Sequence, residues 1–400
     1  MQTQANQKPN PRSPDCHKRE KPQIQPSTKV LHLSQSQITT DARILRAVQW
    51  GESAGYETYC IGVVDRTVPV PSTNVTGVHF DWRFRKTLFG RTLGALYLFV
   101  RISAKTIRVK PNIIHCHQYY LLPVASLTAI LLRASLIYDA HELESETHGR
   151  SRPSRVIVRA LERACWPSIN SFVTVSEEIS EWYARRHKLR PTAVIYNIPK
   201  TMIRPENSVR PDVKRNDGTF QYEALYIGRV GKSRSISQLI DLQSDAGSEI
   251  RLSFLGWDPK SQQTDISKQL KPTVRYLGAV DHRNVVEIAE RFDLGINLLD
   301  HSGLSDFFAL PNKLWEMLYA GIPILANESP PLVRLKESFP NIMLVKEVPE
   351  SHEEWKELVA MTVSLGRRPA FEVPEEFTSD SMVRILTNIY KESLKRRNVS

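Results

Sequence analysis

The feature that most constrains this chain is a regular alternation of short apolar runs and longer amphipathic segments, which begins at Lys29. Val30–Leu33, Tyr59–Val64 and Ile113–His115 have the length and composition of strands, and segments with helical spacing of apolar residues separate them. Strand–helix alternation produces parallel strands with helices on both faces of the sheet. The sequence therefore predicts an α/β fold with doubly wound sheets.

The alternation stops once, over residues 201–221, where prolines and charges replace most apolar side chains. This composition is typical of an interdomain linker. We therefore predict two Rossmann-like domains that face each other across a cleft, the first over residues 29–200 and the second over residues 222–376. Residues 377–400 predict a C-terminal helix that could pack back on the N-terminal domain. In such folds a ligand binds at the carboxyl ends of the strands.

Composition is that of a globular protein, with 41% hydrophobic and 24% charged residues, which excludes a fully disordered chain. Residues 1–28 are rich in Pro, Gln and Lys and lack the apolar core of a secretory signal, so they predict a disordered tail. The longest apolar stretch, Tyr119–Leu132, is shorter than the roughly 20 residues of a membrane span. The four cysteines are widely spaced, which favours a reducing, cytoplasmic setting.

Positive charge is concentrated in the first half of the chain. Residues 1–222 hold 32 Lys and Arg against 18 Asp and Glu, whereas residues 223–400 hold 22 against 25. A basic half indicates an anionic partner such as nucleic acid, a lipid surface or a phosphorylated substrate. Aromatic residues do not interleave with the basic runs as in single-strand binders, so nucleic acid is not favoured.

The segment Arg83–Lys110 carries eight Lys or Arg and no acid, and it predicts a basic amphipathic helix. The expected core stripe is Phe89, Leu93, Leu96, Val100, Ala104 and Ile107. A cationic stripe with Leu98 near it consists of Arg101, Lys105 and Arg108, and a later helix repeats the pattern with Arg152, Arg155, Arg159 and Arg163. These faces are either solvated or contact anionic headgroups at the inner face of a membrane; we favour the second interpretation.

Two segments of the second half suit phosphate and ribose binding. Leu225–Arg234 is a strand that enters a glycine-containing turn with three cations, followed by a helix. A Walker P-loop is excluded because Tyr226 occupies the position of its first glycine, and a solvated basic turn remains the alternative. Leu310–Ala326 predicts a loop, a helix and a buried strand, in which Glu316 either binds ribose hydroxyls or pairs with Lys313 on the surface.

These segments, together with Tyr138–Glu142, resemble glycosyltransferase family 4, whose members are retaining nucleotide-sugar transferases of the two-domain GT-B fold. Leu225–Arg234 is similar to the family's Gly-Arg turn, and Pro311–Ala326 is similar to its donor-site helix. Supporting matches are Ile113–His117, Val173–Glu177 and Val194–Asn197. Together the matches cover most of the chain between about residues 30 and 330.

The resemblance implies roles for individual residues of this sequence. His141 would lie at the reaction centre, and Arg229 and Arg234 would hold the donor diphosphate as catalytic cations. The implied donor-binding residues are Gly228, Arg229, Lys232, Arg234, Pro311, Asn312, Lys313 and Glu316. The expected residues on the acceptor side are Thr40, Asp41, Arg43, His117, Asp139 and Glu142. Fixed cations stabilise the leaving diphosphate, so we expect no metal and no cofactor besides the donor.

Two departures concern the donor sugar and the acceptor. Phe308 stands where many members carry the first of two glutamates spaced eight residues apart, and Ser34–Arg43 replaces their Gly-Gly loop. The histidines allow a second interpretation, because His115, His117 and His141 all lie at sheet ends and could gather into a metal cluster. A zinc-protease motif is excluded, since position 145 is Ser145.

The sequence therefore predicts a cytoplasmic glycosyltransferase, peripheral to the membrane, that moves a sugar from a nucleotide-diphosphate donor to a lipid-linked or polysaccharide-precursor acceptor. The alternative is a catalytically degenerate protein of the same fold that binds an anionic surface or nucleic acid as a scaffold. The charge asymmetry and Phe308 favour this alternative, whereas the order of the motifs favours the enzyme.

Overall fold

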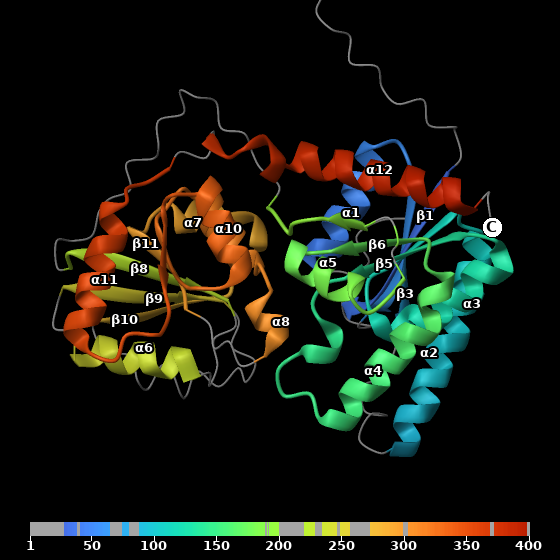
Figure 1. The fold of residues 1–400 in the computed structure, drawn as a ribbon, viewed down its shortest axis with the longest axis horizontal. Helices are drawn as coiled ribbons and strands as arrows, with labels where there is room; N and C mark the ends of the chain where they lie inside the picture. The colour runs from blue at the N-terminus through green and yellow to red at the C-terminus, as the bar shows by residue number, and fades with distance from the viewer. Residues whose placement is uncertain are drawn as a thin grey trace, which may run out of the picture.

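The computed structural model describes most of the chain in two α/β domains that lie side by side (Figure 1). The described residues are 28–37, 41–64, 74–79, 88–188, 190, 192–199, 220–228, 234–245, 249–256, 273–298, 303–368 and 372–397. The predicted tail and almost all of the predicted linker lie outside these ranges.

The N-terminal domain contains a seven-stranded parallel sheet in the order β3-β2-β1-β4-β5-β6-β7. Its strands are β1 (Lys29–Gln37), β2 (Glu57–Val64), β3 (Val75–His79), β4 (Ile113–Cys116), β5 (Ser135–Ala140), β6 (Ser171–Thr174) and β7 (Thr192–Val194). The chain order reverses between β1 and β4, which are hydrogen-bonded neighbours. A doubly wound sheet binds its ligand at such a switch point.

The C-terminal domain contains a six-stranded parallel sheet in the order β10-β9-β8-β11-β12-β13. Its strands are β8 (Tyr222–Ile227), β9 (Ile250–Leu255), β10 (Val274–Gly278), β11 (Leu294–Asn297), β12 (Ile324–Asn327) and β13 (Ile342–Val345). Its switch point lies between β8 and β11. The predicted α/β fold with two Rossmann-like sheets is therefore confirmed.

Helices cover the sheets as the alternation predicts. In the N-terminal domain they are α1 (Ala42–Ser53), α2 (Leu88–Val109), α3 (Leu122–Leu132), α4 (Arg152–Cys165) and α5 (Glu177–Ala184). The later helices are α6 (Arg234–Asp245), α7 (Val285–Ala289), α8 (Leu304–Phe307), α9 (Asn312–Tyr319), α10 (Pro330–Ser338), α11 (His352–Ser364) and α12 (Ser379–Arg397). None of the helices in the described ranges is both long and apolar enough to cross a bilayer.

The central strands follow the burial rule for parallel sheets. Every residue of β4, β5 and β6 is buried, because helices cover both faces of the sheet. Local signals set several helix starts: the side chain of Asp41 accepts the backbone N–H of Arg43 and Ile44 at the start of α1, and Ser176 caps α5 through Ile179. The sequence pattern did not predict β3 and β13, which are edge strands of the two sheets, nor α8 and α10.

The final helix, α12, leaves the C-terminal domain and lies across the N-terminal sheet (Figure 1). Tyr390 is fully buried, with its ring 5.1 Å from that of Tyr56, and Ser135 donates a hydrogen bond of 2.8 Å to the carbonyl of Ser393. The end of the chain therefore belongs to the packing of the first domain.

The predicted core stripe of α2 is wrong. Leu96 and Val100 are 59% and 55% exposed, whereas Leu98, expected beside the cations on the surface, is only 8% exposed. At 100° per residue, Val100 lies 200° around the helix from Leu98, on the opposite side. The helix thus has apolar residues on two faces, and the face with Leu98 and Ile102 packs on the sheet.

Candidate active site

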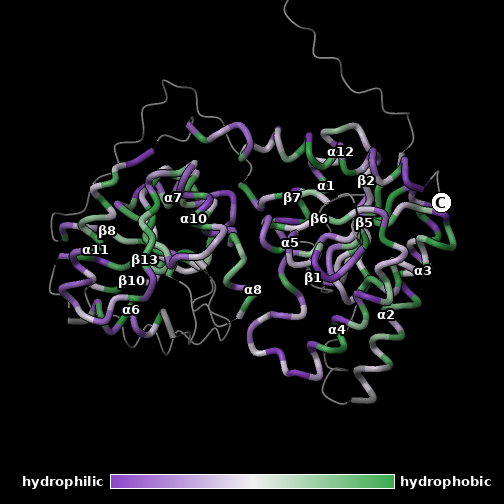
Figure 2. The backbone as a smooth tube through the Cα atoms, viewed as in Figure 1, coloured by the Kyte–Doolittle hydropathy of each residue, from purple (hydrophilic) through white to green (hydrophobic). Residues whose placement is uncertain are grey.

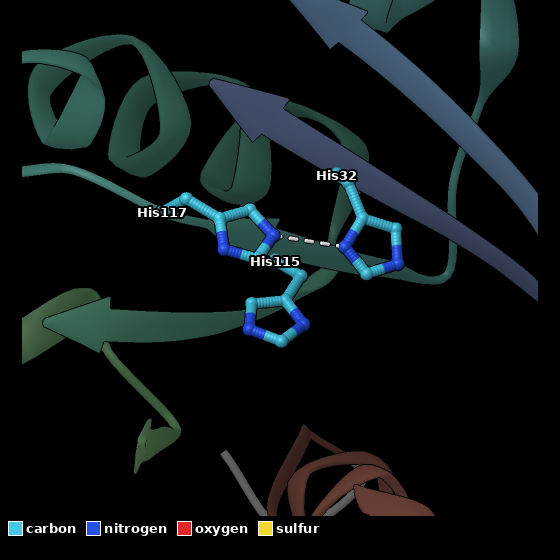
Figure 3. Close-up of side chains that lie close together, drawn as sticks. All are labelled: His32, His115 and His117. Atoms are coloured by element: carbon cyan, nitrogen blue, oxygen red, sulfur yellow. Dashed lines mark hydrogen bonds between the residues drawn. The ribbon is translucent and has the colours of Figure 1, made fainter. Parts of the chain in front are cut away.

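Histidines gather at the carboxyl ends of the central N-terminal strands. His32 lies within β1, His115 lies within β4, and His117 and His141 directly follow β4 and β5. His32 Nδ1 lies 2.9 Å from His117 Nε2, and His117 Nδ1 lies 3.1 Å from His141 Nε2. Figure 3 shows His32 and His117 facing each other, with His115 beside them.

Asp139 on β5 is the acceptor on which this cluster converges. Its Oδ2 lies 3.2 Å from His117 Nδ1, 3.5 Å from His115 Nε2 and 3.6 Å from His141 Nε2. Its Oδ1 accepts a hydrogen bond of 2.6 Å from Arg43. Burial opposes ionisation of this carboxyl, but the charge of Arg43 and the histidine donors hold the pKa of Asp139 well below its usual value.

The three fully buried histidines, His32, His115 and His117, are neutral at physiological pH. Burial lowers the pKa of His32 and His115, and it lowers the pKa of His117 to about 3 because a charged imidazole there loses its hydration. His141 differs from them, since 20% of its side chain is exposed. It is therefore the member of the cluster that a substrate can reach.

Arg43 has a structural role. Its side chain is buried, and it donates hydrogen bonds to Asp139 and to the carbonyl of Ile195. The resemblance implies an acceptor-side position for Arg43, and in the structure its side chain is buried beside Asp139, another residue expected on that side. Asp41 caps the same helix, so both residues hold α1 in place beside the cluster. Glu142 is exposed next to His141, and Thr40 lies outside the described residues.

The C-terminal domain contributes a glycine turn and a buried lysine. Gly228 follows β8 with a φ of +139°, a conformation that side chains disfavour, and an added Cβ would lie 3.6 Å from Lys313. Lys313 is buried, and its Nζ lies 4.3 Å from the ring centroid of Tyr226. Burial lowers the pKa of Lys313 to about 7. The alternative prediction, in which Lys313 pairs with Glu316 on the surface, is therefore wrong.

Glu316 lies one turn further along α9 and is half-buried. Burial raises its pKa to about 7, and the nearby charge of Arg46 opposes this shift. Gly295 lets α9 lie close to β11, because a Cβ there would collide with Met317. The helix α9 therefore packs closely on β11, and Asn312 at its start contacts the N-terminal domain.

Three side chains connect the two domains beside Glu316. Arg46 on α1 donates to Asn197, and Asn197 donates to Asn312 at the start of α9. Pro311 precedes that helix in an extended conformation. Asn312, which is predicted to bind the donor, is therefore linked by hydrogen bonds to the N-terminal domain.

The domains also touch through the segment with the unexpected Phe308. Its carbonyl accepts a hydrogen bond of 2.7 Å from Ser176, and its ring packs against the N-terminal core. Ser305 accepts the backbone N–H of Leu143 at 3.1 Å, close to His141 in sequence. The residue in place of the first glutamate is therefore an interdomain contact.

Of the predicted diphosphate cations, Arg229 and Lys232 lie outside the described residues, and for Arg234 the structure describes the backbone at the start of α6. His32, Arg46 and Tyr390 lie at the site although the sequence motifs do not include them. Tyr390 Oη lies 2.9 Å from His115 Nδ1. The only sequence signal that could have indicated one of these three residues is a polar residue, His32, within an apolar strand.

Comparisons with known proteins agree with this fold. The chain is similar in structure to HepE of Anabaena in complex with UDP (TM-score 0.66, 14% identity, covering 91% of this chain and 100% of HepE). It is also similar to sucrose-phosphate synthase of Thermosynechococcus elongatus (TM-score 0.65, 13% identity, covering 92% of this chain and 100% of the synthase). A glycosyltransferase of Rickettsia africae is similar as well (TM-score 0.63, 12% identity, covering 92% of this chain and 99% of that protein). No curated protein matches the sequence.

The fold is that of the two-domain GT-B glycosyltransferases. Within this class, residues 44–198 match the model of Glycosyltransferase Family 4. The resemblance to that family is therefore confirmed over the N-terminal domain, which carries the histidine cluster.

Proposed function

We propose that the chain transfers a sugar from a nucleotide-diphosphate donor to an acceptor, with the reaction at the contact between the two domains. The observation that carries this proposal is that a donor-type helix is hydrogen-bonded to the domain that holds His141: Arg46, Asn197 and Asn312 connect α9 to the domain that the family model matches. The solved complexes of HepE with UDP and with UDP-glucose make UDP-sugars the first donors to test.

In this proposal, different residues bind the two parts of the donor, the ribose hydroxyls and the charged diphosphate. Glu316 accepts hydrogen bonds from the ribose, and Arg229, Lys232 and Arg234, which follow Gly228 in the sequence, contact the diphosphate. Negative charge develops on the leaving diphosphate, and fixed cations stabilise it without a metal ion at the phosphates. The family resemblance implies transfer with retention of configuration.

His141 contacts the transferred sugar in this proposal. Its exposed edge is available to a substrate, and its Nε2 is held by His117 and Asp139. When one ring nitrogen of a histidine is held by neighbouring residues, the imidazole presents its other edge to a ligand in one defined orientation. The cluster behind it therefore positions this side chain.

The proposed acceptor is lipid-linked, because the N-terminal domain exposes apolar side chains on three neighbouring helices. Their most exposed members are Leu96 and Val100 on α2, Ile130 and Leu131 on α3, and Val156 and Ile157 on α4. We call these six residues the apolar surface. Figure 2 shows hydrophobic residues along α2 at the periphery of the molecule. Soluble proteins rarely leave so many large apolar residues exposed without a partner.

Cations accompany the apolar surface. Exposed arginines on or next to the same helices are Arg101, Arg108, Arg133, Arg152 and Arg163. Arg155 and Arg159 pair with Glu146, so these two offer less free charge than the sequence suggested. Apolar side chains flanked by cations fit the boundary of an anionic bilayer, where headgroup attraction and apolar burial act together.

The direct test is a panel of UDP-, GDP- and ADP-sugars with the full chain, scored for donor binding by calorimetry and for donor hydrolysis or transfer to lipid-linked acceptors. Binding of at least one nucleotide sugar with turnover supports the proposal. Absence of binding and turnover across the panel, with tight binding to anionic vesicles or nucleic acid, would establish the scaffold alternative instead.

A further inference from the structure

Three potential metal ligands face one another at the exposed end of the histidine cluster. His117 Nδ1, His141 Nε2 and Asp139 Oδ2 are separated by 3.1, 3.2 and 3.6 Å. The three atoms come from two adjacent strands, β4 and β5, and their mutual closeness is compatible with a shared metal ion. They form a group of two imidazoles and one carboxylate.

We propose that His117, Asp139 and His141 bind a divalent transition-metal ion such as Zn²⁺. Zinc takes nitrogen and carboxylate ligands at about 2.0–2.2 Å, and ligands at that distance in tetrahedral or octahedral arrangement lie roughly 3.0–3.6 Å apart. The separations of these atoms already fall in that range, so a metal ion would bind with little movement of the backbone.

Hydrogen bonds alone cannot make all three contacts among His117 Nδ1, His141 Nε2 and Asp139 Oδ2 favourable. If both His117 Nδ1 and His141 Nε2 carry protons, both donate to Asp139 and the nitrogen–nitrogen contact holds two donors. If only one nitrogen carries a proton, the lone pair of the other faces the carboxylate oxygen. A cation between the three atoms is attracted to each of them, which removes this conflict.

The groups behind the three ligands suit a metal site. His117 Nε2 lies 2.9 Å from His32 Nδ1, so His117 can donate its second N–H when Nδ1 binds the ion. Asp139 Oδ1 is held by Arg43 at 2.6 Å. Ligating histidines and carboxylates in metalloproteins have such outer partners, which fix the direction of their lone pairs.

The other histidine group is less suitable. His32, His115 and His117 also lie near one another, but the rings of His115 and His117 stack at 14° with centroids 4.4 Å apart. Stacked rings direct their lone pairs along parallel planes and not toward one point. All three are buried, whereas His141 gives the proposed site an exposed edge through which an ion can enter.

Metal binding would regulate the active site, a consequence that rests on the proposed function. An ion on His141 Nε2 would fix and charge the side chain that is to contact the sugar. We therefore expect Zn²⁺ to inhibit transfer, while the phosphate cations of the other domain remain available to the donor.

The test is calorimetric titration of the EDTA-treated full chain with Zn²⁺, with Co²⁺ absorption as an independent report on nitrogen and oxygen ligands. We expect about one ion per chain. His141→Ala, which removes a partly exposed ligand, should weaken binding at least about tenfold, since even loss of an outer partner costs 10–100-fold. Thermal unfolding verifies that the variant is folded.

His148→Ala is the matched control, because His148 is exposed and close in sequence but outside the group. Cys16→Ser tests binding by the Cys16-His17 pair of the N-terminal segment. No binding, unchanged binding in His141→Ala, or loss of binding in Cys16→Ser would overturn the proposal. Zinc binding without any transferase activity would leave the metal site standing and refute the proposed function; the reverse result would refute only the metal site.

Discussion

Arg43 and Asp139, 96 residues apart, form a buried salt bridge in which Nη2 lies 2.6 Å from Oδ1. Both side chains are almost fully shielded from solvent. This pair joins the start of α1 to the end of β5 and sets the carboxylate on which three histidines converge.

Asp139→Asn should destabilise the protein by about 3–5 kcal/mol, because it leaves the charge of Arg43 buried without a partner. Chemical denaturation measures this, with Asp281→Asn in an exposed pair as the control that leaves unfolding nearly unchanged. The pKa of Asp139 is lower in the folded protein than in the unfolded chain. The ionised carboxylate therefore stabilises the protein at pH values above the ordinary pKa of aspartate, and this stabilisation decreases as the pH falls below that value. Equal stability of the two variants would show that the pair contributes little.

Glu316 should make donor binding depend on pH. Its pKa is about 7, so the carboxylate that accepts ribose hydrogen bonds forms as pH rises through neutrality. We expect the affinity for UDP-glucose to increase between pH 6 and pH 8, and Glu316→Gln to weaken binding and remove this dependence. Calorimetry decides, with exposed Glu337→Gln on α10 as the control. Identical profiles for wild type and Glu316→Gln would exclude the ribose role.

Lys313→Met should stabilise the C-terminal domain at pH 7. Burial lowers the native pKa of Lys313 to about 7, whereas the unfolded lysine keeps its ordinary value near 10.5. The unfolded state therefore binds more protons between these values, so stability rises with pH there, by about 1.4 kcal/mol for each unit at most. The variant lacks this dependence. Thermal melting at pH 7 and pH 9 compares both proteins, and parallel shifts would argue against the lowered pKa.

Arg229→Ala should reduce turnover as well as donor affinity. Removing one charge-assisted contact to the diphosphate costs roughly 1.5–3 kcal/mol, which is about tenfold or more in rate. The charge is larger in the transition state, so kcat falls along with kcat/KM. Steady-state kinetics are the measurement, with exposed Arg283→Ala as the control. An unchanged kcat in a folded variant would contradict the assignment.

The apolar surface should direct the protein to anionic vesicles. Leu96→Ser with Val100→Ser removes exposed apolar contacts, and reversal of Arg101, Lys105 and Arg108 to Glu removes attraction of about 1 kcal/mol per cation. We expect at least about tenfold weaker co-sedimentation for either variant. Val333→Ser with Met361→Ser, exposed in the other domain, is the matched control. Equal recovery with neutral and anionic vesicles would rule out the surface.

The sequence by itself determined the α/β class, the two domains and the strand ends that carry His117 and His141. These properties follow from local periodicity and from the residue that comes directly after each apolar run. The alternation was clear because central parallel strands are buried on both faces. The short edge elements β3 and β13 carry less of this signal.

Only the tertiary structure decided which faces and residues meet. Apolar residues occupy two sides of α2, and only the side of Leu98 and Ile102 is buried in the core of the N-terminal domain. His32 joins the cluster because β1 pairs with β4, 83 residues downstream in register, and Tyr390 joins it because α12 returns to the first domain. The sequence predicts that this helix could pack back on the first domain, but strand order and the side chains that meet across such distances are long-range properties, which no local pattern in the sequence encodes.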